Sequence, residues 1–373
     1  MPLGKFKFTL LPTKNAIQSI QRQYQERIYS SIRYNIGSLF EIHLMVEIIQ
    51  GDCLKSLRNL APKSVNTCIT SPPYFGLRDY GNTEWKGGDE KCDHINNINP
   101  RSTRPKGKLD DGSLDKYNEM PFIKECYKCG AIRKDNQLGL EETPEEFIEN
   151  LVKVFREVKR VLRDDGTVWL NLGDSYLPNK QLGCIPFKVA ISLQDDGWYL
   201  RQDIIWHKPN PMPESVRDRC TKSHEYIFLL SKSKKYYYDN EAIKEPVKKD
   251  WGIRDRTNGK YHNKGSGLSP HTGLTKSYEK RNKRSVWIVT TKPFKGAHFA
   301  VFPMDLIEPC VLAGCPEGGT VLDPFGGSGT TGLVAQNNNR NAILLELNPE
   351  YIEIAESRLY PKQRDFLKAR VVA

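Results

Sequence analysis

The sequence predicts an α/β fold, in which a mainly parallel, twisted sheet carries helices on both of its faces. The main observation is that short runs of apolar and β-branched residues alternate along the chain with longer stretches of helical period. A second observation is a glycine-rich turn at 326–329 that joins such a run to a helix. Parallel strands need crossover connections of this kind, which are usually helices. With 373 residues, of which 38% are hydrophobic, the chain can build a large core, and its apolar runs are too short for a membrane span.

The first half of the chain contains five expected elements. Strands are predicted at 46–50, 65–70 and 167–172, and helices at 54–60 and from Pro144 to about residue 162. Thr143 is a good N-cap for the longer helix, and Glu146 at its third position completes a capping box. The Asp-Asp-Gly sequence at 164–166 is expected to end this helix.

The second half of the chain continues the alternation. Helices are predicted at 185–193, 304–313 and 330–336, and strands at 199–206, 225–230, 320–325 and 342–346. No internal repeat is visible.

The formal charge of +11 is concentrated in one segment. Residues 231–300 hold 17 Lys and Arg against 6 Asp and Glu, so the rest of the chain is neutral overall. Such a segment is typical of a contact with a polyanion, because neutralised phosphates release counterions. Interleaved aromatic residues favour contact with nucleic acid over a merely solvated loop. They are Tyr236, Tyr237, Tyr238, Trp251, Tyr261 and Tyr278.

The cysteine pattern and the N-terminus bear on the compartment. Nine cysteines without the spacing of a disulfide framework, and the lack of an apolar signal segment, predict a reducing, cytoplasmic location. Residues 1–44 form a basic N-terminal extension that is nearly free of acids. A targeting segment, a loosely attached tail and an upstream start codon are the alternatives for it.

Ser71-Pro72-Pro73-Tyr74 directly follows the strand at 65–70. Neither proline can donate a backbone hydrogen bond, and each holds its φ angle at about −65°, so the strand ends in a rigid bend with outward carbonyl groups. A rigid row of acceptors beside an aromatic ring can bind a ligand as well as turn the chain.

The glycine-rich turn, Asp323-Pro-Phe-Gly-Gly-Ser-Gly-Thr-Thr331, lies where doubly wound folds bind nucleotide-like ligands. It lacks both the Gly-Lys-Ser/Thr of a P-loop and the GxGxxG dinucleotide fingerprint, so an adenosine ligand without a pyrophosphate fits better. The next strand ends at Glu346, whose carboxylate can accept hydrogen bonds from both hydroxyls of a ribose. Capping of the following helix is the alternative role for Glu346.

Together, TSPPY, DPFGGSGTTG and the strand-end sequence LLEL make the chain resemble the β group of S-adenosylmethionine-dependent DNA amino-methyltransferases, the SPPY-type cytosine-N4 and adenine-N6 enzymes. The resemblance covers roughly residues 46–362. It implies a Rossmann-like methyltransferase fold with a circularly permuted motif order, in which the catalytic motif precedes the cofactor motif. It also implies a target-recognition region between the two motifs, where the basic segment lies.

In this family a target base is flipped out of the duplex, and its exocyclic amine attacks the cofactor's methyl group directly, without a covalent intermediate. The resemblance assigns catalysis to Ser71, Pro72, Pro73 and Tyr74. The Ser71 hydroxyl and the Pro72 carbonyl would accept the amine hydrogens and so localise the nitrogen lone pair, while Tyr74 stacks on the base. Carbon-5 cytosine methylation is disfavoured, because Cys310, the one cysteine after a suitable proline, falls in an apolar helix before the cofactor turn.

The resemblance also implies a set of residues around S-adenosylmethionine. Asp323, Phe325, Gly327, Ser328, Gly329 and Thr330 would surround its methionine and ribose parts, Glu346 its ribose hydroxyls and Asp52 its adenine amine, while His298, Phe299 and Pro303 belong to a segment that would close over its methionine end.

Ser71 favours cytosine as the target, since family members with Ser at this motif position mostly modify cytosine N4. Adenine N6 stays as the alternative, because both amines offer the same hydrogen-bond donors. More distant alternatives are an RNA or protein amine as the methyl acceptor, and a DNA-binding protein without catalytic activity, which has no need for two intact motifs. The recognised DNA sequence and the oligomeric state are not readable from these motifs.

Four residues in a polar insertion have the spacing of a metal site. Cys92 and His94 form one pair and Cys126 and Cys129 the other, which predicts a structural, tetrahedral Zn²⁺. The insertion has few core residues and needs such a staple to be ordered. A redox CxxC is the alternative, but no strand-to-helix context supports it. The other cysteines are expected in the core: Cys53, Cys68, Cys184, Cys220, Cys310 and Cys315.

These assignments divide the chain into six parts. They are an N-terminal extension (1–44), a catalytic half (45–80 and 141–230), the zinc-binding insertion (81–140), a basic target-recognition region (231–296), a cofactor-binding half (297–362) and a C-terminal tail (363–373). The expected partners are double-stranded DNA and a cognate restriction endonuclease, with no membrane. A prokaryotic or phage-encoded enzyme associated with the nucleoid fits this set of expectations.

Overall fold

The computed structural model describes residues 46–76, 83–89, 91–92, 125–126, 128–135, 137–177, 179–247, 279–292 and 302–360. The expected N-terminal extension and C-terminal tail, and residues 248–278 and 293–300 of the basic segment, lie outside the described residues. Among the helices in the described ranges, none combines the length and the hydropathy that a bilayer crossing needs.

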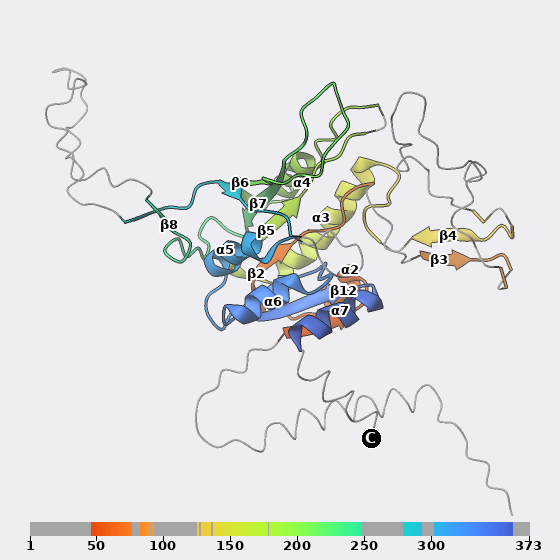
Figure 1. Cartoon of the computed structure of the whole chain (residues 1–373). Helices are drawn as coiled ribbons and strands as arrows, with labels where there is room; N and C mark the ends of the chain where they lie inside the picture. The colour runs from red at the N-terminus through yellow and green to blue at the C-terminus, as the bar shows by residue number, and fades with distance from the viewer. Residues whose placement is uncertain are drawn as a thin grey trace, which may run out of the picture. The chain divides into compact units, whose positions relative to one another are not determined.

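An eight-stranded sheet forms the centre of the fold (Figure 1), in the order β1-β12-β11-β2-β5-β7-β6-β10. Its strands are Val46–Gln50 (β1), Val65–Thr70 (β2), Leu162–Leu172 (β5), Tyr199–His207 (β6), His224–Ser231 (β7), Val286–Ile288 (β10), Thr320–Asp323 (β11) and Asn341–Glu346 (β12). Neighbouring strands are parallel except where β7 pairs with β5 and β6. The expected mainly parallel sheet is therefore confirmed.

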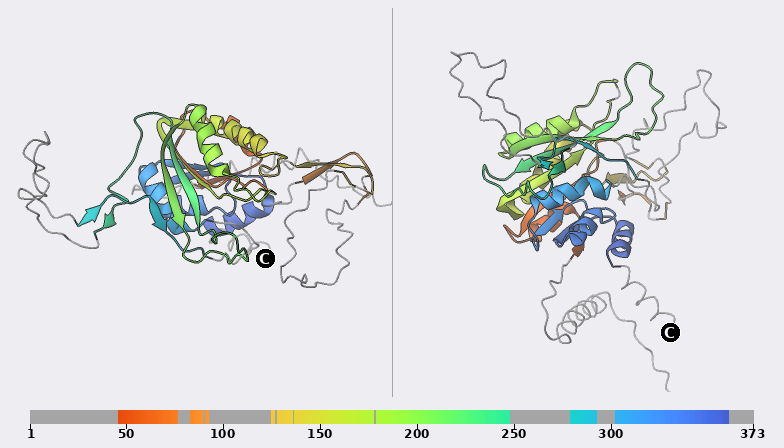
Figure 2. Two further views of the ribbon diagram at one scale, coloured as in Figure 1. Left: turned by 90° about the horizontal axis from the view of Figure 1, so that it is seen from above. Right: turned by 60° about the vertical axis from the view of Figure 1, so that its left-hand side comes forward.

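Helices cover both faces of this sheet (Figure 2). Three pack on one face: Cys53–Asn59 (α2), Pro144–Val161 (α3) and Ile185–Asp195 (α4). Three pack on the other: Met304–Gly314 (α5), Thr330–Asn337 (α6) and Pro349–Leu359 (α7).

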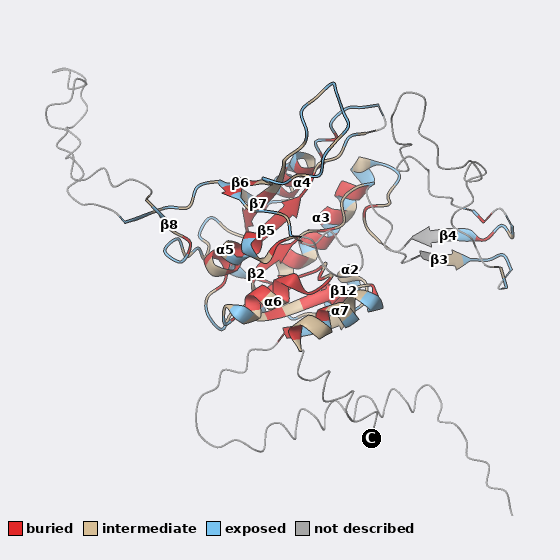
Figure 3. Ribbon diagram, viewed as in Figure 1, coloured by how far each residue is buried: buried red, intermediate tan, exposed pale blue. Residues whose placement is uncertain are grey.

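Two apolar cores result, one on each face, and the buried strands between them are red in Figure 3. Along β5, Val168 and Leu170 belong to the first core and Trp169 to the second, because successive strand residues point to opposite faces. A strand buried on both faces is apolar at every position, which is why these strands read as continuous apolar runs.

The long helix α3 begins as expected but ends earlier. The Thr143 hydroxyl accepts the backbone N–H of Glu146 at 3.2 Å, while the Glu146 carboxylate accepts from the N–H of Glu142 at 3.4 Å instead of from the cap residue. Strand β5 starts at Leu162, so the Asp-Asp-Gly sequence at 164–166 lies inside a strand. The β2–β5 register shifts at this point, which lets the strand absorb the extra residues.

Several small elements were not expected from the sequence. Strand β10 comes from the basic segment and pairs in parallel with β6. Thr83–Lys86 (β3) and Ile132–Asp135 (β4) form an antiparallel pair within the polar insertion, and Glu245–Pro246 (β8) pairs with Lys280–Arg281 (β9). These strands are too short or too polar to give a periodic signal.

The described aromatic residues of the basic segment contact protein. Tyr238 stacks on the buried Trp169, with ring centroids 6.2 Å apart, and the Arg201 guanidinium lies 5.4 Å from the Tyr236 ring centroid. These rings therefore anchor the start of the segment to the sheet, which weakens their use as evidence for contact with nucleic acid. Trp251, Tyr261 and Tyr278 lie outside the described residues.

The expectation that all remaining cysteines lie in the core is wrong for two of them. Cys184 and Cys220 are exposed, since both lie in connections outside the two cores. Cys310 is 1% exposed in α5, and burial raises the pKa of its thiol. A neutral, buried thiol is a poor nucleophile, which agrees with the interpretation of Cys310 as a core residue.

Candidate functional site

A cavity lies where the carboxyl ends of four parallel strands, β1, β2, β11 and β12, meet. This edge is where open α/β sheets bind ligands. Nine residues that the sequence predicts for the site line the cavity: Asp52, Ser71, Pro73, Asp323, Phe325, Gly327, Ser328, Thr330 and Glu346. The sheet thus brings the TSPPY stretch and the glycine-rich turn into one cavity, although about 250 residues separate them in the sequence.

Asp323 connects the two motifs. Its carboxylate accepts hydrogen bonds from the Thr70 and Thr331 hydroxyls, both at 2.6 Å, and from the backbone N–H of Phe325 at 3.0 Å. Asp323 is 2% exposed, and burial raises the pKa of its carboxyl while the three donors oppose that rise. Hydroxyl contacts of 2.6 Å are typical of an ionised acceptor. The carboxylate therefore holds the end of β2, the turn and the start of α6 together.

Glu346 lies at the end of β12 and organises the other side of the turn. One carboxylate oxygen accepts the N–H of Gly327 at 2.7 Å, and the other accepts the N–H of Asn348 at 2.8 Å. Burial raises the pKa of this carboxyl above its usual value, and these backbone donors oppose that effect. A carboxylate has about four acceptor positions, so this one can still accept from a ligand in the cavity.

Asp52 follows β1 and caps α2. Its side chain accepts the backbone N–H of Lys55 at 2.9 Å, so the residue has a structural role besides lining the cavity. Its neighbour Cys53 also lines the cavity, and burial raises the pKa of that thiol to about 12. A neutral thiol offers no nucleophile at this site.

The TSPPY residues do not all line the cavity. Ser71 and Pro73 do, whereas Pro72 is buried and Tyr74 packs beside the first core. The Tyr74 hydroxyl lies 3.4 Å from the Ser71 hydroxyl. A Cβ atom added to Gly173 would lie 2.6 Å from the Tyr74 ring, so the ring packs directly on this glycine.

Gly329 does not lie in the cavity wall. It starts α6 with a φ angle of +77°, and a Cβ atom there would lie 2.9 Å from the Cβ atom of Ala355. The glycine is therefore required by its left-handed conformation and by close packing on α7. This position does not support a role for Gly329 in binding a ligand directly.

The segment at 297–303 is described only in part. Pro303 is buried and forms the N-cap of α5, while His298 and Phe299 lie outside the described residues. Phe302 lines the cavity in place of Pro303. The sequence interpretation also missed Gln137, Leu138 and Tyr351, whose positions no local motif marks.

Three of the four predicted metal ligands lie together. The thiols of Cys92, Cys126 and Cys129 all lie within 4.8 Å of one another, and the sulfur atoms of Cys92 and Cys126 are 3.7 Å apart. The N–H of Gly130 donates to the carbonyl oxygen of Cys126 at 2.7 Å, which closes a tight turn between the last two cysteines. His94 lies outside the described residues.

Comparisons with known proteins agree on one family. The family model N6_N4_Mtase, described as DNA methylase, matches residues 65–357. Type II methyltransferase M.Cfr9I of Citrobacter freundii is 39% identical, over 86% of this chain and 90% of its own length. M.SmaI of Serratia marcescens is also 39% identical, over 84% and 90%. The solved structure of PvuII DNA methyltransferase (cytosine-N4-specific) is 18% identical, with a TM-score of 0.54 over 84% of this chain and 87% of that chain, a likeness of fold.

Proposed function

Since the chain belongs to the N6/N4 DNA methylase family, we propose that it transfers the methyl group of S-adenosylmethionine to the N4 amine of a cytosine in double-stranded DNA. The observation that carries this proposal is the single cavity that contains Ser71 and the glycine-rich turn. A donor and an acceptor must meet for direct transfer, and the Thr70–Asp323 hydrogen bond holds the two binding segments side by side.

The residues of the cavity fit S-adenosylmethionine. The Glu346 carboxylate lines the cavity as the proposed acceptor for the ribose hydroxyls, and Phe325 and Tyr351 offer aromatic surface to an adenine ring. Asp323 is proposed to act by holding the turn, because its carboxylate already has three protein donors. When bound, the cofactor supplies a methyl group on a positively charged sulfonium, which a neutral amine can attack directly.

The TSPPY residues are proposed to bind and activate the target amine. A cytosine amine is a weak nucleophile, because its lone pair is delocalised into the ring. Acceptance of its hydrogens by the Ser71 hydroxyl and the Pro72 carbonyl favours a pyramidal nitrogen with a localised lone pair. Tyr74 is proposed as the surface on which the base stacks. The base must leave the duplex to reach a cavity of this kind, so base flipping is part of the proposal.

Nucleoside mass spectrometry tests the reaction and the target base together. Unmethylated genomic DNA is incubated with the protein and S-adenosylmethionine, digested and analysed, with a reaction lacking the cofactor as the control. We expect N4-methylcytosine. N6-methyladenine would keep the reaction and mechanism but contradict the weight given to Ser71. If folded protein that binds the cofactor leaves the DNA without any methylated base, the proposal is contradicted and RNA or protein amines are favoured as methyl acceptors. The same assay can include RNA and protein as competitors.

The cysteine cluster is proposed to be a structural zinc site, with Cys92, Cys126 and Cys129 as ligands and His94 as the fourth. A tetrahedron with Zn–S bonds of about 2.3 Å separates its sulfur atoms by about 3.8 Å. The 3.7 Å between the Cys92 and Cys126 sulfur atoms fits this geometry. The β3–β4 pairing is short and its surroundings are polar, so a metal supplies the stability that a core does not.

Elemental analysis tests the zinc site. Protein purified without chelators is expected to contain about one equivalent of zinc, and the Cys129→Ser variant to lose most of it, because three remaining ligands bind the metal more weakly. Cys220→Ser is the matched control, since Cys220 is an exposed cysteine outside the cluster, and it should keep its zinc. Less than about half an equivalent in the unmodified protein would contradict four ligands acting together.

The remaining assignments follow from the family and the motif order. We propose a circularly permuted methyltransferase fold, with target recognition by the basic region at 231–296 and the part boundaries given by the sequence. The relatives are named as Type II methyltransferases, so a cognate restriction endonuclease is the proposed partner and a prokaryotic cytoplasm the proposed location.

A further inference from the structure

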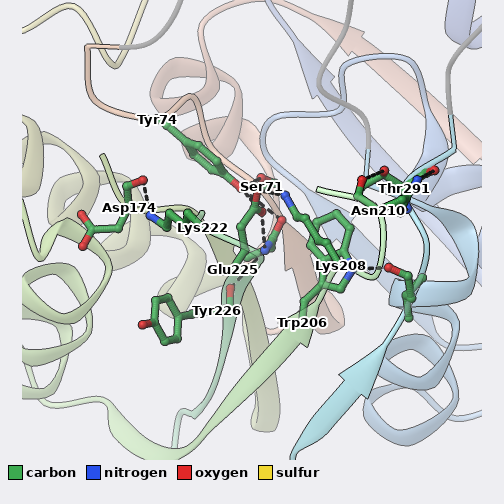
Figure 4. Close-up of polar contacts among 12 residues, drawn as sticks. Ser71, Tyr74, Asp174, Trp206, Lys208, Asn210, Lys222, Glu225, Tyr226 and Thr291 are labelled. Atoms are coloured by element: carbon green, nitrogen blue, oxygen red, sulfur yellow. Dashed lines mark hydrogen bonds and ion pairs between the residues drawn. The ribbon is translucent and has the colours of Figure 1, made fainter. Parts of the chain in front are cut away.

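The hydroxyl of Tyr74 contacts side chains on two strands, neither of which carries a predicted site residue (Figure 4). It lies 2.7 Å from a carboxylate oxygen of Glu225 on β7 and 3.2 Å from the amide oxygen of Asn171 on β5. Glu225 in turn forms an ion pair with Lys208 at the end of β6. The aromatic residue of TSPPY is therefore connected to a polar cluster that the motif itself does not contain.

The donor directions in this cluster follow from its chemistry. The Asn171 amide nitrogen donates to the carbonyl oxygen of Tyr226 at 3.0 Å, which directs the amide oxygen of Asn171 toward Tyr74. Glu225 is paired with Lys208, and an ionised carboxylate only accepts. Both neighbours are acceptors, so the Tyr74 hydroxyl donates its one hydrogen, and Glu225 at 2.7 Å is a nearer acceptor than Asn171 at 3.2 Å. The Tyr74 oxygen can then act as an acceptor itself.

Ser71 is the group placed to donate to that oxygen. The two hydroxyl oxygens are 3.4 Å apart, which is long for a hydrogen bond, so the contact biases the orientation of the Ser71 hydroxyl without locking it. A Ser71 hydrogen directed toward Tyr74 leaves the Ser71 lone pairs for a ligand in the cavity. Such a serine accepts from an amine and has no hydrogen to offer to a carbonyl group.

We propose that Glu225 is a positioning residue for methyl transfer, acting through the Tyr74 hydroxyl to present Ser71 as a hydrogen-bond acceptor. The inference rests on the proposed function and adds a reason for its substrate class. An exocyclic amine satisfies an accepting serine, whereas the carbonyl that replaces the amine in thymine or uracil does not. Lys208 contributes as the ion-pair partner of Glu225, and its Nζ atom is itself held 4.3 Å from the ring centroid of Trp206.

Two further features support a positioning role. The side chains of Lys208 and Glu225 are only 19% and 16% exposed, so their interaction is weakly screened by solvent. Gly173 packs against the ring of Tyr74. Both the ring and the hydroxyl of Tyr74 are therefore held by contacts outside the motif.

A double-mutant cycle between Tyr74 and Glu225 tests the inference. The measured quantity is the single-turnover rate of transfer from labelled S-adenosylmethionine to unmethylated genomic DNA for the unmodified protein, Glu225→Gln, Tyr74→Phe and the double variant. Each single substitution is expected to lower the rate about tenfold, because a charge-assisted hydrogen bond is weakened or lost. The double variant should be no slower than the singles, since both act through one hydroxyl.

Cofactor affinity and melting temperature serve as the readouts for a merely structural effect. Both should stay near those of the unmodified protein in the two single variants, so that the loss falls on the transfer rate alone. Glu157→Gln is the matched control, because the Glu157 carboxylate is ion-paired with Arg160 on the same helix α3 and not with a residue of this cluster, and its rate should be unchanged.

Several results would overturn the inference. Rate losses that multiply in the double variant would mean that Glu225 acts independently of Tyr74. An unchanged rate in Tyr74→Phe would contradict the role of the hydroxyl even if Glu225→Gln did not fold. An unmodified protein that transfers no label to DNA would instead contradict the proposed function itself, which separates the two failures.

Discussion

The Ser71→Ala variant is expected to lose about a hundredfold in kcat while it binds S-adenosylmethionine with nearly normal affinity. Removal of one preorganised polar group that acts in a transition state typically has an effect of this size. Ser71 is proposed to accept a hydrogen of the target amine, an interaction that strengthens as the amine attacks. The glycine-rich turn keeps all its own hydrogen bonds in this variant, so the cofactor site is preserved.

Single-turnover kinetics and calorimetry together check this result. Ser64→Ala is the matched control, because Ser64 lies before the other end of β2 and its hydroxyl bonds only to the local carbonyl oxygen of Ala61 among the described contacts. The control should keep both rate and affinity. If Ser71→Ala instead lowers the cofactor affinity but keeps the single-turnover transfer rate at saturating cofactor, the catalytic role assigned to Ser71 is contradicted.

The Asp323→Ala variant is expected to show the opposite pattern, with cofactor affinity weakened tenfold or more and a lower melting temperature. The substitution leaves the buried Thr70 and Thr331 hydroxyls without their acceptor, and each unsatisfied group costs about 1–3 kcal/mol. The turn that follows β11 also loses the bond to the N–H of Phe325, so its backbone is no longer held in the binding conformation.

Calorimetric titration with S-adenosylmethionine and thermal unfolding measure the two effects. Asp323→Asn is the milder variant, because it keeps the shape of the side chain but loses the charge that three donors favour, and it should fall between the alanine variant and the unmodified protein. Asp164→Ala is the control, since the Asp164 side chain is 67% exposed and pairs with Lys63 at the surface. Wild-type affinity in Asp323→Ala would contradict the role of this carboxylate.

Local patterns were sufficient for most of the fold. Three kinds of feature lie where the sequence predicts them: the strands formed by β-branched runs, the Thr143 cap of α3 and the glycine-rich turn before α6. Each of them depends on interactions within a few residues. The Asp-Asp-Gly sequence at 164–166 was misinterpreted as a helix end, since its conformation depends on pairing with β2, about one hundred residues earlier.

The part of the candidate site that lies in sequence motifs was also predictable. Ser71, Asp323 and Glu346 each lie in a recognisable motif at the end of a strand, and the parallel sheet brings such ends together. The lining residue Tyr351 and the polar partners Asn171 and Glu225 have no motif, so only packing assigns them to the site.

The sequence by itself determined the α/β class, the family and the two segments that form the cavity, because these follow from local periodicity and short motifs. Only the tertiary structure decided how the side chains of those segments are held. Asp323 was expected to surround a ligand, and it lines the cavity while its carboxylate also has three protein donors. Tyr74 was expected to stack on a base, and its hydroxyl is also hydrogen-bonded to Glu225. The physical reason is that a hydrogen bond between side chains is made or lost when their distance changes by a few tenths of an ångström, and these side chains come from residues that are far apart in the chain.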